Sequence, residues 1–138
     1  MKLPTLNGWN SSPFPGEFDQ NAATNILEKW KKLLGLTDWD IKISFRDALD
    51  LDTGPARSNH NPNLQTADIR ILAMNDRQAS HMSDSDPESD IVHELIHIRL
   101  WPIDPKENDI GRVHSICREQ SIEWIAKALI NLDRNRQP

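Results

Sequence analysis

The chain has 138 residues, enough for one domain with a modest hydrophobic core, and its formal net charge of -5 comes from acidic and basic residues interspersed along the sequence. This distribution provides no basic surface for nucleic acid, and no apolar run approaches the roughly 20 residues that a membrane-spanning helix needs. The single cysteine, Cys117, excludes an internal disulfide. No apolar stretch follows Lys2, so we expect a cytoplasmic protein without a signal peptide.

The N-terminal residues 1–16 are predicted to form an extended arm, because three prolines interrupt any helix there. A single domain is expected to follow over residues 17–138. Its first predicted element is a helix over residues 17–34, where apolar side chains recur at steps of three or four residues. Gly35 follows as a typical C-terminal stop. The predicted apolar face of this helix consists of Phe18, Ala22, Ile26, Trp30 and Leu33.

Two strands are predicted from the alternation of apolar and polar side chains, which is typical of strands with one buried face. The first covers residues 39–46 and the second covers Thr66–Ala73. Residues 47–65 are predicted as a long loop with room for one short strand, and residues 75–85 as a further loop. The apolar faces consist of Trp39, Ile41, Ile43 and Phe45 in the first strand and of Ala67, Ile69 and Ile71 in the second.

The residues Asp86-Pro87-Glu88 predict the start of a second helix, with aspartate at the N-cap, proline at the first helical position and an acid in the first turn. This helix must end by Pro102. The segment Ile91–Leu100 is apolar nearly all round, which is typical of a helix buried between two layers.

The pattern H-E-x-x-H interrupts this apolar surface at His93, Glu94 and His97. Histidines four residues apart lie one turn apart on the same face of a helix, so both imidazoles can reach one metal ion. Zinc lowers the pKa of a bound water, and a neighbouring carboxylate can take the proton of that water as it attacks a carbonyl. The pattern therefore predicts two zinc ligands, His93 and His97, and a general base, Glu94.

A last helix is predicted to begin at Asp109 as N-cap and to run to about Asp133. Glu119 projects into the middle of its apolar stripe, and Glu123 lies one turn further on. Because a catalytic zinc needs three protein ligands, Glu119 is the preferred third ligand, and Glu123 is expected to accept a hydrogen bond from a ligand histidine. The predicted stripe consists of Ser115, Ile122, Ile125, Ala126, Leu129 and Ile130.

Other assignments of these polar residues remain open at this point. The roles of Glu119 and Glu123 could be exchanged. His114 is an alternative third ligand, but it lies about 140° from Glu119 around a continuous helix, so only one of them can face the metal. His60 and His81 fall in predicted loops and are expected to be exposed; alternatively, one of them stabilises an oxyanion, since the chain has no tyrosine for that role.

The H-E-L-I-H segment, followed by a helix that carries E-x-x-x-E, resembles the gluzincin branch of the zincin metallopeptidases. The short chain is similar to minimal gluzincins and to phage-type metallopeptidases. In that family a glutamate on a later helix completes the metal site, and an acid four residues on supports a ligand histidine; Glu119 and Glu123 match these positions. The chain departs from the usual N-E-x-x-S-D pattern, because Arg118 replaces the asparagine and Glu123 the aspartate.

The resemblance implies an α+β, zincin-like fold, in which a small twisted sheet packs on the active-site helix and a C-terminal helix supplies the third ligand. It also implies that an extended peptide adds to an edge strand, for which Thr66–Ala73 is the expected segment. The expected function is zinc-dependent hydrolysis of peptide bonds. Two alternatives are a phage-type regulatory protein whose peptidase site acts on one partner, such as a repressor, and a non-catalytic module with a structural metal.

Overall fold

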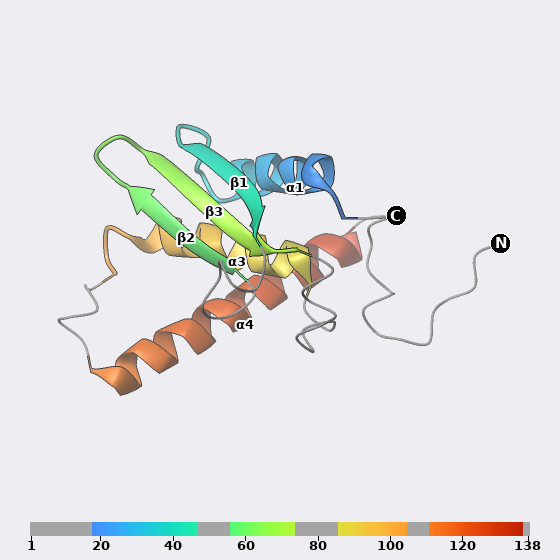
Figure 1. Cartoon of the computed structure of the whole chain (residues 1–138). Coiled ribbons are helices and arrows are strands. Elements are labelled where there is room, and N and C mark those ends of the chain that lie inside the picture. The colour runs from blue at the N-terminus through green and yellow to red at the C-terminus, as the bar shows by residue number, and fades with distance from the viewer. Residues whose placement is uncertain (1–17, 47–55, 74–85, 105–110, 137–138) are drawn as a thin grey trace.

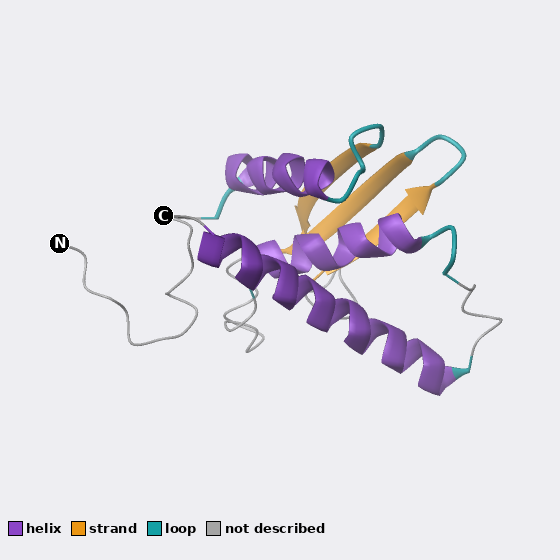
Figure 2. Cartoon of the chain, turned by 180° about the vertical axis from the view of Figure 1, so that it is seen from behind, coloured by secondary structure: helices purple, strands orange, loops and turns teal. Residues whose placement is uncertain are grey.

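The computed structural model describes residues 18–46, 56–73, 86–104 and 111–136, and these form a small α+β structure (Figure 1). A three-stranded mixed sheet has the strand order β1-β3-β2, with β1 and β3 parallel and β2 antiparallel to β3. Helices α1 and α3 lie on one face of the sheet, and α4 crosses α3 on the side away from the sheet (Figure 2). The elements are α1 (Gln20–Leu33), β1 (Asp40–Arg46), β2 (Ala56–Asn61), β3 (Thr66–Leu72), α3 (Pro87–Leu100) and α4 (Arg112–Arg136).

The first predicted helix is confirmed with a later start. Asp19 is its N-cap, and the Asp19 carboxylate accepts a hydrogen bond of 2.9 Å from the Ala22 N–H. Gly35 follows the helix with a φ of 70°, a left-handed conformation that glycine adopts without steric cost. On the predicted apolar face, Ile26 and Trp30 are buried and Ala22 is partly buried. Phe18 is buried but precedes the helix, and Leu33 is 52% exposed.

Both predicted strands are confirmed, as β1 and β3, but the expectation that Thr66–Ala73 is an edge strand is wrong. A further strand, β2, pairs antiparallel with β3, so that β3 is central and β2 forms the edge. The turn between them is closed by the Asn61 carboxamide oxygen, which accepts hydrogen bonds from the N–H groups of Asn63 and Leu64. His60 consequently lies on a strand and not in the predicted loop.

The predicted second helix is confirmed as α3. The Asp86 carboxylate accepts a hydrogen bond of 2.9 Å from the Glu88 N–H, Pro87 occupies the first turn, and the helix ends at Leu100. Its side chains are buried on almost all sides, as the apolar pattern indicated. The core between the sheet and the helices includes the fully buried Ile69, Ile71, Ile91, Leu95 and Ile98.

The last helix, α4, begins at Arg112 and extends beyond the predicted end to Arg136. Its buried face contains Ile122, Ala126 and Ile130, whereas Ile125, which the apolar stripe included, is 47% exposed. The expected N-cap Asp109, the loop residue His81 and the arm 1–16 lie outside the described residues. No helix in the described ranges is long and apolar enough to cross a membrane.

A buried carboxylate joins the three helices at the start of α3. Glu88 is 3% exposed and accepts a hydrogen bond of 2.7 Å from the Trp30 indole of α1. Lys29 of α1 lies 3.0 Å from the same carboxylate, and Arg134 of α4 lies 2.9 Å from it. Burial alone would raise the pKa of Glu88, but these three partners outweigh it and lower the pKa. Arg134 also contacts the N-cap Asp86 at 2.6 Å.

Candidate metal centre

His93 and His97 face α4 from successive turns of α3, with their ring centroids 5.0 Å apart. The crossing of the two helices brings the Glu119 carboxylate of α4 between the two rings. One Glu119 oxygen lies 3.0 Å from His97 Nε2, and the other lies 3.4 Å from His93 Nε2. One donor atom from each of the three residues can be chosen so that all lie within 4.8 Å of one another.

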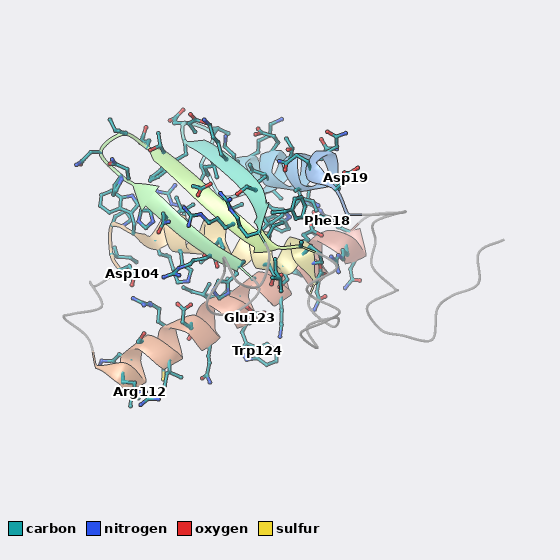
Figure 3. The ribbon with its side chains drawn as sticks, viewed as in Figure 1. Phe18, Asp19, Asp104, Arg112, Glu123 and Trp124 are labelled. Carbon is teal, nitrogen blue, oxygen red and sulfur yellow. The ribbon has the colours of Figure 1, made fainter. Side chains whose placement is uncertain are left out.

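Glu123 approaches His93 from the opposite edge of its ring. The His93 Nδ1 atom lies 2.9 Å from a Glu123 oxygen, a distance at which Nδ1–H donates a hydrogen bond to the carboxylate. With Nδ1 so engaged, Nε2 is the ring nitrogen directed at Glu119 and His97. Figure 3 shows Glu123 on the side of α4 that faces α3, while Trp124 points away from it.

The two histidines and Glu119 stabilise one another electrostatically. Burial disfavours the charged imidazole of His93, but the hydrogen bond to Glu119 and the nearby carboxylates outweigh it and raise its pKa. Hydrogen bonds from His93 and His97 hold the pKa of Glu119 far below its usual range. In this arrangement the two rings therefore hold the Glu119 carboxylate in its charged form.

Glu94 follows His93 on α3, and its side chain meets Ser58 of the edge strand β2. It is 8% exposed, and burial raises its pKa, against the effects of a hydrogen bond from the Ser58 side chain and the charge of His93. A carboxylate with a raised pKa is suited to accept a proton near neutral pH and to release it again.

Polar residues of three elements border the cluster. Arg118 of α4 lies 3.0 Å from Asp104, which follows α3, and 3.6 Å from Glu119. His60 of β2 packs edge-on against the Trp39 ring at a centroid distance of 6.4 Å. Partial burial lowers the pKa of His60, and the charge of His97 lowers it further.

The structure brings together four of the residues that the sequence singled out, namely His93, His97, Glu119 and Glu123. It does not bring in His114, which is exposed near the start of α4 and belongs to no metal-binding group among the described residues. Sequence patterns did not single out Ser58 or Asp104. Ser58 lies on a strand without apolar alternation, although the Asn61-Pro62-Asn63 turn signal could have indicated a hairpin there.

Two imidazole nitrogens and one carboxylate form a donor set that zinc accepts in catalytic sites, where a fourth position stays open. The donor atoms of His93, His97 and Glu119 lie close enough together to fit such an ion. No protein-family model matches the chain, and neither does a curated protein or a solved structure. The fold and the site thus define a small α+β protein with a His/His/Glu group that could hold a metal ion.

Proposed function

We propose that this chain is a zincin-like, zinc-dependent metallopeptidase in which His93, His97 and Glu119 hold the ion and Glu94 is the general base. The observation that carries the proposal is the convergence of these side chains. Glu119 comes from a separate helix, yet its carboxylate lies at hydrogen-bond distance from both histidines of the H-E-x-x-H pattern. Among the described residues the group has three members, the number of protein ligands that is typical of a catalytic zinc, whereas a structural zinc usually has four.

The protein side chains divide the work of hydrolysis. When bound, a zinc ion supplies Lewis acidity, which polarises a carbonyl and lowers the pKa of water towards neutrality. Glu94 accepts a proton from the attacking water and passes it to the leaving amine, so that the C–N bond breaks as the amine is protonated. Glu123 holds the His93 ring through Nδ1, which fixes the direction of Nε2.

The substrate we propose is an extended peptide or protein segment that lies along β2. The candidate for main-chain pairing with a peptide is β2 and not β3, because β3 is already paired with β1 on one side and β2 on the other. The Ser58 side chain of β2 reaches Glu94, so the edge borders the group that would handle the proton.

The test compares the wild type with Glu94→Gln, which keeps the shape of the side chain but cannot accept the proton. Both proteins are expected to bind one zinc ion by elemental analysis, and the variant is expected to cleave a mixed peptide library at least about 100-fold more slowly. Glu28→Gln, at an exposed acid on α1, is the control. Wild-type cleavage rates in the Glu94 variant, or a wild type without stoichiometric zinc, would overturn the proposal.

A further inference from the structure

We propose that Arg118 is a positioning residue that holds the Glu119 carboxylate in place for the metal. The inference rests on the proposed metal centre. Arg118 is not a member of the His93/His97/Glu119 group that the described residues form.

The Arg118 guanidinium lies between two carboxylates from different parts of the chain. Its Nη1 atom is 3.0 Å from an Asp104 oxygen, and its Nε atom is 3.6 Å from a Glu119 oxygen. The Arg118 side chain is only 18% exposed and that of Asp104 21%. Figure 3 shows Asp104 just after α3, so this ion pair ties the end of α3 to the turn of α4 that carries Glu119.

Glu119 needs such a partner because its other contacts are lost on metal binding. The Nε2 atoms of His93 and His97 now hold the carboxylate, and these are the atoms that would bind the ion. The Glu119 side chain is 46% exposed, so without a partner it would be free to adopt several rotamers. The Arg118 guanidinium is held by its hydrogen bond to Asp104, and its buried Nε lies 3.6 Å from Glu119. This Nε–H can therefore donate to the carboxylate when the histidine contacts are lost.

The positive charge of Arg118 would by itself oppose a divalent cation. Asp104 compensates for that charge through a close ion pair in a half-buried position, where salt screens the interaction less than at the surface. The net effect of the pair on the ion is therefore small, while its effect on the direction of the Glu119 carboxylate remains. Arg118 is therefore expected to affect the coordination geometry of the metal, which spectroscopy can test.

The experiment measures zinc affinity by competition with a fluorescent chelator for the wild type, Arg118→Met, Arg118→Lys and Asp104→Asn. Arg118→Met is expected to weaken zinc binding about 10-fold or more, as loss of an outer partner of a ligand does. Arg118→Lys should recover part of the affinity, because it restores the charge without the planar fork. The visible absorption spectrum of the cobalt-substituted protein should change in Arg118→Met, since the carboxylate no longer coordinates in the same way.

Arg70→Met is the matched control, since Arg70 pairs with Asp68 at 2.9 Å on the sheet, away from the cluster. It should leave zinc affinity and the cobalt spectrum unchanged. Asp104→Asn should also weaken zinc binding, because Arg118 loses the ion pair that holds it. Wild-type affinity and spectrum in Arg118→Met would overturn the inference; if that variant does not fold, wild-type affinity in Asp104→Asn would do so. Failure of the wild type to bind zinc would instead contradict the metal centre itself.

Discussion

The two glutamates of α4 act on one imidazole from opposite edges. Glu119 lies near Nε2 of His93, and Glu123 lies near Nδ1. A spacing of four residues places both carboxylates on the same side of the helix, one turn apart, so a single element can supply both a ligand and the partner that orients a ligand. Of the two glutamates, Glu119 is the one that the described contacts place within hydrogen-bond distance of both histidines, and this geometry favours Glu119 as the ligand of the proposed metal centre.

Removal of the charge at Glu123 should weaken metal binding while leaving the three ligands in place. Glu123→Gln is expected to reduce zinc affinity about 10-fold to 100-fold, because His93 loses the carboxylate that orients its ring and raises its basicity. Chelator competition measures the effect. Glu28→Gln removes an exposed acid from α1 and should not change the affinity. Equal zinc affinity in the Glu123 variant and the wild type would show that the hydrogen bond has no such role.

Much of the site could be predicted at the residue scale because helical spacing is a local property. The separation of His93 and His97 places them on one face, and Glu119 stood out as an acid inside an apolar stripe. Contacts that depend on how elements cross could not be predicted in this way. The pairing of Asp104 with Arg118 and the approach of Ser58 to Glu94 exist only after the chain has folded.

Among the elements, the start of α3 depends most clearly on a single charged group. Glu88 is buried and contacts α1 through Trp30 and Lys29, and α4 through Arg134. Its pKa is lowered in the folded state, so this carboxylate stabilises the fold at pH values above its ordinary pKa of 4.5. That contribution is lost as the pH falls through the lower, folded pKa.

Acid unfolding should therefore depend on Glu88. In the wild type, the free energy of unfolding is expected to decrease as the pH falls from about 6 to about 3. Glu88→Gln should be less stable by about 1.5–3 kcal/mol at neutral pH, the usual value of hydrogen bonds to a charged group, and should show a shallower pH dependence. Urea denaturation at a series of pH values measures both quantities. Parallel pH profiles for the two proteins would contradict this account.

The strand β2 shows why the sheet was harder to predict than the helices. Its six residues, A-R-S-N-H-N, have no apolar alternation, because an edge strand with one partner can be polar on most sides. Without β2, β3 looks like an edge, whereas the parallel pairing with β1 and the antiparallel pairing with β2 make it central. One polar segment thus changed the position of a strand that was itself correctly predicted.

On the scale of the whole molecule, a bound metal would join α3 to α4 across their crossing. Zinc is then expected to raise the thermal unfolding midpoint, and free zinc at about 100 times its dissociation constant corresponds to about 2.7 kcal/mol of stabilisation. Calorimetry with zinc and with a chelator measures the shift. His97→Ala should abolish the shift without abolishing folding. A midpoint that does not respond to zinc in the wild type would argue against the metal centre.

The Arg134 contacts have a consequence for the motion of α4. Near its C-terminal end the helix is attached to Asp86 and Glu88, and its buried residues all lie from Ile122 onwards, whereas the earlier turns meet α3 through polar groups that include Glu119. Release of a metal would therefore loosen one end of the helix before the other. On chelation, amide hydrogen exchange should accelerate in residues 112–121 and remain slow in residues 126–133. The N-terminal half of α4 would then open while its C-terminal half stays attached to the start of α3.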